Sequence, residues 1–168
     1  MRKVLIPVDG SDNAINAVRH ISNRHVQSGG IKVHLLHVAT PLPKAIAGYL
    51  SAYDIASHYR DEARKAFAGP SEVLENFGVP YERHTARGDK AECIDHQARS
   101  LGVDEIVMGT GRKNALTRLI EGSLTHQVMS RADVPVEVIA GRKESPFERY
   151  GLPAGLGAAL ALLFVANE

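Results

Sequence analysis

The sequence contains 168 residues, of which 44% are hydrophobic and 23% are charged, and its formal net charge is +1. A chain of this length forms one domain that buries about 70% of its unfolded surface. The balanced charge argues against binding nucleic acid or anionic membranes through bulk electrostatics. The single cysteine, Cys93, excludes an internal disulfide and a cysteine-cluster metal site. The hydrophobic run after Lys3 is too short for a signal peptide, so we expect a cytoplasmic protein.

Five hydrophobic runs are typical of buried strands, because each is short and bounded by turn-forming residues. These runs are 4–8, 31–38, 79–86, 103–108 and 134–139. Helical segments alternate with them, and this alternation predicts an α/β fold with a five-stranded, mainly parallel sheet and helices on both faces. Charged residues in 79–86 and Pro135 in 134–139 indicate that these two strands lie at the edges of the sheet.

The segments between the strands have the spacing of amphipathic helices. The first begins at a cap provided by Ser11 or Asp12 and stops before two consecutive glycines. The longest runs from about 50 to 68. Gly69-Pro70 is then expected to interrupt it, because proline removes a helical donor, and a short piece restarts over 70–77. Two further helices are expected, from the Gly88-Asp89 turn to Gly102 and from about Ser123 to Arg131.

The stretch 109–125 combines glycines, hydroxyl groups and cations directly after a buried strand. Glycines let backbone N–H groups approach an anion, and a helix N-terminus offers unpaired donors with a positive dipole. Arg112, Lys113 and Arg118 add positive charge beside it. Ligands of parallel α/β sheets bind beyond the carboxyl ends of the strands, where the run 7–10 and Val38 are also expected. The sequence therefore predicts a phosphate cradle within a larger nucleotide site.

Four separated blocks carry a more specific signal: Val4-Leu5-Ile6-Pro7-Val8-Asp9-Gly10-Ser11, Gly88-Asp89, Ile106-Val107-Met108-Gly109-Thr110, and Gly122-Ser123 through Val136. Blocks in a fixed order are far more informative than one glycine motif. Over residues 2–140 they resemble the universal stress protein family. The resemblance implies a Rossmann-like domain of the adenine-nucleotide-binding type over 1–141, often a homodimer through its last strand. Residues 142–168 would form a linker and an apolar tail.

Members of this family divide into those that bind ATP and those that do not. The binders carry a glycine, two residues, a second glycine, nine residues, and then a glycine followed by serine or threonine. Gly109, Gly122 and Ser123 match this pattern, whereas Arg112 stands in place of the second glycine and Gly111 lies one position earlier. Arg112 can pair with a phosphate through its guanidinium group or block the cradle.

The resemblance implies a site assembled from several parts of the chain. Asp9 would hold a ribose, hydrophobic residues at two strand ends would flank adenine, and the glycine-rich stretch would hold the phosphates. The expected site residues are Pro7, Val8, Asp9, Val38, Met108, Gly109, Gly111, Arg112, Gly122, Ser123, Leu124 and Thr125. The ligand would be ATP or a related adenine nucleotide, with any Mg²⁺ carried by its phosphates.

We therefore expect a stress-response protein that binds the nucleotide as a regulatory ligand. No enzyme is predicted, because Ser123 and His126 lie at a helical spacing that seldom aligns a nucleophile with its base. Slow hydrolysis of bound ATP is left open. The eight histidines contain no His-Glu-x-x-His pattern, so no metal site is predicted. The alternative is a nucleotide-free, dimeric interaction module that acts through its dimer edge or its tail.

The tail has its own alternatives. Residues 150–166 contain no charged side chain, and this length is at the lower limit of about 17 to 25 residues that span a bilayer. Glycines and a proline weaken its first part, which leaves a helical segment over about 156–165 that is too short to span. This segment would pack on its own domain, a dimer mate or a partner, or attach to a membrane surface.

Overall fold

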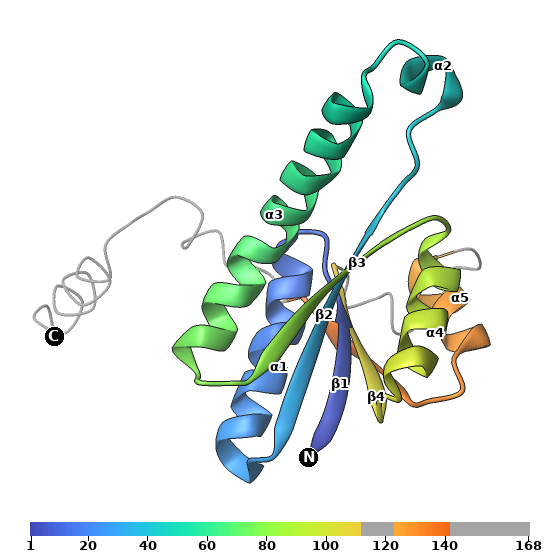
Figure 1. Ribbon diagram of the computed structural model, residues 1–168. Coiled ribbons are helices and arrows are strands. Elements are labelled where there is room, and N and C mark those ends of the chain that lie inside the picture. The colour runs from blue at the N-terminus through green and yellow to red at the C-terminus, as the bar shows by residue number, and fades with distance from the viewer. Residues whose placement is uncertain (112–122, 142–168) are drawn as a thin grey trace, which may run out of the picture.

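The computed structural model describes residues 1–111 and 123–141, which form a five-stranded sheet flanked by helices (Figure 1). The strands are β1 (Arg2–Pro7), β2 (Ile31–Ala39), β3 (Tyr81–Arg87), β4 (Glu105–Thr110) and β5 (Val136–Ala140). Their order is β3-β2-β1-β4-β5, and all four neighbouring pairs are parallel. The predicted α/β fold is confirmed, and β3 and β5 lie at the edges as expected. The predicted linker and tail lie outside the described residues.

The described part of the chain contains five helices, four of which cover the two faces of the sheet. They are α1 (Asp12–Ser28), α2 (Lys44–Ala47), α3 (Ala52–Asn76), α4 (Lys90–Leu101) and α5 (Leu124–Arg131). Figure 1 shows α1 and α3 on one face and α4 and α5 on the other, with α2 projecting beyond the strand ends. The four-residue α2 lies between the expected strand 31–38 and the helix expected from about 50, where the sequence predicted no helix. Within 1–111 and 123–141, no helix combines the length and hydrophobicity that crossing a membrane requires.

Successive residues of each central strand point into two different hydrophobic cores, because side chains alternate along a strand. Val4 and Ile6 of β1 pack with the helices α1 and α3, whereas Leu5 packs with α4 and α5. All three side chains are fully buried. The continuous hydrophobic runs recognised in the sequence are therefore those of parallel strands covered on both faces.

Helix α3 continues through Gly69 and Pro70, so the predicted interruption at these residues is wrong. Phe67 and Leu74 lie in the same hydrophobic core on either side of the proline, and both are buried. Burial of these large side chains outweighs the one backbone hydrogen bond that proline removes. Gly69 also allows α1 to approach, because a Cβ there would lie 2.9 Å from Cδ1 of Ile15.

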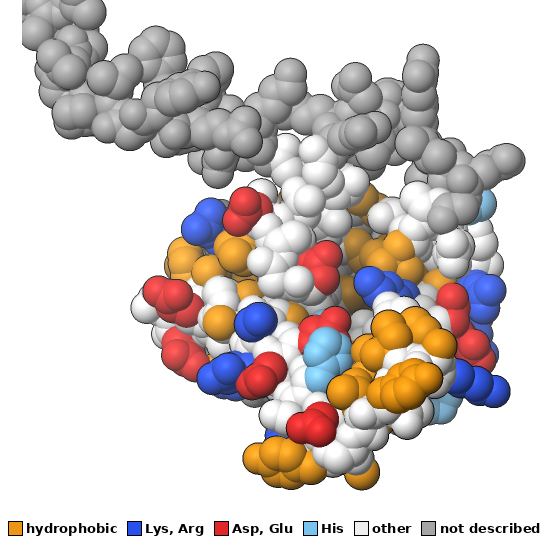
Figure 2. All heavy atoms as spheres, turned by 90° about the horizontal axis from the view of Figure 1, so that it is seen from above, with side chains coloured by type: hydrophobic (Ala, Val, Ile, Leu, Met, Phe, Trp, Pro, Cys, Tyr) orange, Lys and Arg blue, Asp and Glu red, His pale blue; other side chains and the backbone are white. Residues whose placement is uncertain are grey.

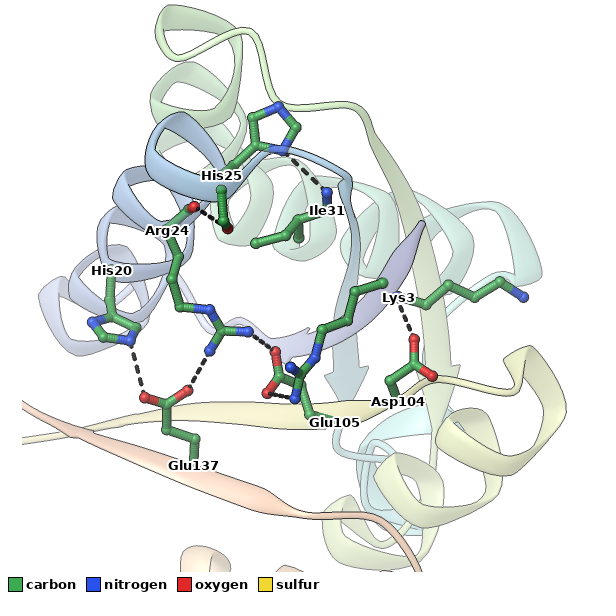
Figure 3. A network of polar contacts seen from close by, with 10 residues as sticks. Lys3, His20, Arg24, His25, Ile31, Asp104, Glu105 and Glu137 are labelled. Atoms are coloured by element: carbon green, nitrogen blue, oxygen red, sulfur yellow. Dashed lines mark hydrogen bonds and ion pairs between the residues drawn. The ribbon is translucent and has the colours of Figure 1, made fainter.

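A network of ion pairs joins α1 to the amino ends of the strands (Figure 3). The guanidinium group of Arg24 contacts the carboxylates of Glu105 on β4 and Glu137 on β5, the latter at 2.8 Å. Arg2 donates a second bond to Glu105 at 2.9 Å, and His20 lies 2.9 Å from Glu137. Only 4% of Glu105 is exposed to solvent. The buried carboxylate is therefore compensated by two guanidinium groups from different elements.

Candidate functional site

A cavity of about 550 Å³ lies at the carboxyl ends of β1, β2 and β4. The strand order reverses between β1 and β4, and ligands of open α/β sheets bind at such a switch point. Figure 2 looks onto this end of the molecule and shows acidic, basic and hydrophobic side chains interspersed on the visible face. The cavity wall contains seven of the predicted site residues: Pro7, Val8, Asp9, Val38, Met108, Gly109 and Leu124.

A tight turn after β1 places Asp9 in the cavity wall. The N–H of Val8 donates to the carbonyl oxygen of Leu36 at 2.8 Å, which holds the end of β1 beside β2. Gly10 then adopts a φ of 80°, a conformation that favours glycine. The Oδ1 atom of Asp9 accepts a bond from the N–H of Ser11 at 3.0 Å. One carboxylate oxygen is thus engaged in the turn, as in an Asx turn.

The Asp9 carboxyl group is ionised at neutral pH. Partial burial alone would raise its pKa, but hydrogen bonding from Ser11 and the positive charge of Lys90 together hold the pKa below its ordinary value. A carboxylate accepts hydrogen bonds and donates none. Asp9 is therefore suited to bind a ligand that offers donors, such as the hydroxyl groups of a sugar.

Gly109 allows the N-terminal end of α1 to pass directly over β4. A Cβ atom at this position would lie 1.8 Å from the carbonyl oxygen of Asn13 and 2.3 Å from its carbonyl carbon. Ser11 fixes this end of α1, because its hydroxyl accepts a bond from the N–H of Ala14 at 3.4 Å, as the predicted cap requires. The glycine selected as a phosphate contact is thus also needed for packing at the cavity wall.

The cavity wall contains polar residues that the sequence analysis did not select: Asn13, His37, Thr40, Glu62, Lys65 and Lys90. Lys90 had a usable signal, since it is a cation at the start of α4 directly after the Gly88-Asp89 turn. Glu62 and Lys65 come from α3, and no spacing in the sequence relates this helix to the strand ends.

His37 is a buried member of this wall, with 6% of its surface exposed. Its Nδ1 atom lies 3.2 Å from the carbonyl oxygen of Val8 and donates to it, since a carbonyl can only accept. In the neutral form of the ring, this contact places the proton on Nδ1 and leaves Nε2 as an acceptor. Among the residues described, Nε2 has no hydrogen-bond partner.

The glycine-rich stretch lies partly within the described residues. Ser123 caps α5, because its Oγ atom accepts a bond from the N–H of His126 at 3.2 Å. A Cβ at Gly111 would lie 3.1 Å from Nδ2 of Asn13. Within the described part of the chain, Gly111, Ser123 and Thr125 do not line the cavity. Arg112 and Gly122 lie outside it, so their predicted contacts stay predictions.

The parallel sheet with a cavity at its switch point defines a doubly wound α/β protein. The chain belongs to the universal stress protein family, whose model matches residues 1–140. It is 28% identical over 144 residues to universal stress protein MJ0531 of Methanocaldococcus jannaschii, and the match covers 85% of this chain and 84% of that relative.

Solved structures of this family share the fold. The structure of protein MJ0577, also from Methanocaldococcus jannaschii, matches with a TM-score of 0.68 and 28% identity over 86% of this chain and 98% of that one. A family protein of Arabidopsis thaliana with AMP bound has a TM-score of 0.60 and 20% identity, covering 84% and 93%. One from Archaeoglobus fulgidus in complex with dAMP has a TM-score of 0.58 and 22% identity, covering 83% and 97%.

Proposed function

We propose that this stress protein binds ATP or a related adenine nucleotide in the cavity, as a regulatory ligand. The observation that carries the proposal is that Asp9, Val38 and Gly109 line one cavity although they follow or end three different strands. The volume of about 550 Å³ lies within the range of about 300–1,000 Å³ that is usual for small-molecule sites. The AMP and dAMP held by the Arabidopsis and Archaeoglobus proteins support an adenine nucleotide.

The chemistry of the wall suits the parts of a nucleotide. Val38 and Met108 are hydrophobic and offer contact area for a base, whereas the Asp9 carboxylate can accept bonds from ribose hydroxyls. Lys65 and Lys90 supply positive charge for phosphates, which would also carry Mg²⁺. Each part of the ligand thus has a matching group in one wall.

We propose a regulatory role and not a catalytic one, because Ser123, the candidate nucleophile in the sequence, serves as a helix cap. The Ser123 hydroxyl caps α5, and it contacts the backbone N–H of His126. We further propose that the protein acts in the cytoplasm as a homodimer through β5. This strand lies at the edge of the sheet, where a second copy of the same strand can pair with it.

Asp9→Asn is expected to weaken binding of both ATP and adenosine by about tenfold or more, because the amide loses the charge that strengthens bonds from ribose hydroxyls. Isothermal titration of the full chain with each ligand, with Mg²⁺ present, measures this change. Asp104→Asn is the matched control, since Asp104 also accepts a backbone bond, from Lys3 at 2.7 Å, but lies at the other end of β4. No saturable binding by the wild type at millimolar nucleotide would contradict the proposal and favour the nucleotide-free interaction module.

Lys90→Gln is expected to lower the affinity for ligands that carry phosphate and to leave the affinity for ligands without phosphate unchanged. We expect ATP affinity to fall by about fivefold to tenfold while adenosine affinity is unchanged, because the lysine is assigned to the phosphates. The same titrations measure both values, with Lys44→Gln on the projecting α2 as the control. Equal losses for ATP and adenosine would assign Lys90 to a different part of the ligand.

A further inference from the structure

Three side chains of the types that bind metal ions, His34, Glu82 and His84, meet on β2 and β3, outside the cavity wall. His34 of β2 pairs in register with Glu82 of the edge strand β3, and Leu36 pairs with His84. Residues two apart on a strand point to the same face, so Glu82 and His84 both lie beside His34. Nδ1 of His34 lies 3.1 Å from Nε2 of His84 and 3.5 Å from Oε2 of Glu82. Nε2 of His84 lies 3.8 Å from Oε2 of Glu82.

These three separations match the geometry of a metal ion with three protein ligands. With separations of 3.1, 3.5 and 3.8 Å, the point equidistant from the three ligand atoms lies about 2.0 Å from each of them. Zinc usually lies at about this distance from an imidazole nitrogen or a carboxylate oxygen. Two imidazoles and one carboxylate form a common ligand set for zinc-type ions.

A neighbouring lysine orients the carboxylate of Glu82 for metal binding. Nζ of Lys32 donates to Oε1 of Glu82 at 2.6 Å, which orients the carboxylate and leaves Oε2 directed to the imidazoles. The 3.1 Å contact between the two rings requires a proton on one of the two facing nitrogens. A cation can bind both nitrogens once that ring carries its proton on its other nitrogen.

We propose that His34, Glu82 and His84 bind a zinc-type divalent transition-metal ion, independently of the nucleotide. The His34 side chain is 4% exposed and anchors the site in the sheet, whereas Glu82 and His84 are 49% and 21% exposed. The ion would therefore be reached from solvent and would keep a coordination position for water. It would also join the edge strand β3 to β2. The sequence spacing predicted no metal site, because the ligands are brought together by strand register.

The test is a zinc titration of the full chain, produced without a polyhistidine tag, freed of metal by a chelator and kept free of nucleotide. Competition with a chromophoric chelator measures the affinity, and the absorption spectrum with Co²⁺ measures the coordination geometry. We expect one ion per chain, a tetrahedral cobalt spectrum and a higher melting temperature with zinc. His84→Gln and Glu82→Gln should each weaken zinc binding by at least about tenfold.

The control is His58→Gln, because His58 is an exposed histidine on α3 that also lies near a carboxylate, 3.9 Å from Glu62. Its zinc affinity should equal that of the wild type. Glu82 and His84 lie at a partly exposed edge, so their variants are expected to fold, and circular dichroism checks this. Zinc affinity that is the same in His84→Gln and wild type, or the absence of stoichiometric binding, overturns the site. Neither result bears on nucleotide binding, which is measured separately.

Discussion

Gly109→Ala is expected to destabilise the protein by about 3 kcal/mol and to weaken nucleotide binding at least tenfold. The added methyl group would lie 1.8 Å from the carbonyl oxygen of Asn13, which is backbone and cannot rotate away. Either α1 or β4 must shift, and both elements contribute to the cavity wall. Both the fold and the site should therefore respond to the same methyl group.

Urea unfolding followed by circular dichroism measures the loss of stability, and the ATP titration measures the loss of affinity. Gly48→Ala is the matched control. Gly48 has a helical φ of −68°, and a Cβ there would lie 3.4 Å from the carbonyl oxygen of Lys44, an ordinary contact. This control should unfold at the urea concentration of the wild type or slightly above it. A Gly109→Ala protein as stable as the wild type would show that α1 does not pass over β4 as described.

Arg24→Met is expected to cost about 3 kcal/mol of folding free energy, because it removes one of two guanidinium groups that compensate a buried carboxylate. Among the described residues, Glu105 would then keep only its ion pair with Arg2, whose side chain is 54% exposed. Glu137 would lose its 2.8 Å contact as well. Methionine retains much of the aliphatic length of arginine, so the measured change reports mainly the lost charge.

Urea unfolding at pH 7 measures the cost of Arg24→Met, with Arg64→Met as the control. Arg64 pairs with Asp61 at 3.0 Å, but the two side chains are 76% and 57% exposed. Such a surface pair contributes less than about 1 kcal/mol. Nucleotide affinity should be unchanged in both variants, since the network lies at the amino ends of the strands (Figure 3). Equal destabilisation by the two variants would contradict the role assigned to the Arg24 network.

Most of the fold could be predicted because local signals agreed with the final packing. The hydrophobic runs gave the strands, Ser11 and Ser123 gave helix starts, and Pro135 placed β5 at the edge. The predicted helix interruption at Pro70 was wrong. Burial of the neighbouring side chains outweighs the hydrogen bond that proline removes, and this burial is known only once the packing of α3 is known. None of the four residues of α2 has a buried side chain, so its sequence carries no hydrophobic pattern that would predict a helix.

The candidate site was predicted where it depends on strand ends and missed where it depends on packing between distant elements. Asp9 and Gly109 follow or end hydrophobic strands, and such positions converge in any parallel sheet. Lys65 lines the cavity only because α3 extends past the end of β2. His34 and His84 meet through a register that no spacing along the chain expresses.

The cavity wall draws on both halves of the chain, with Asp9 and Val38 from the first half and Gly109 and Leu124 from the second. A ligand held there would act as a non-covalent cross-link, since it contacts segments that separate when the chain unfolds. At a concentration 100 times its dissociation constant, such a ligand adds about 2.7 kcal/mol to the free energy of unfolding. This gain is close to the loss expected for Arg24→Met. Saturation of the site at one end of the sheet would thus rescue a defect at the other end without any contact between them.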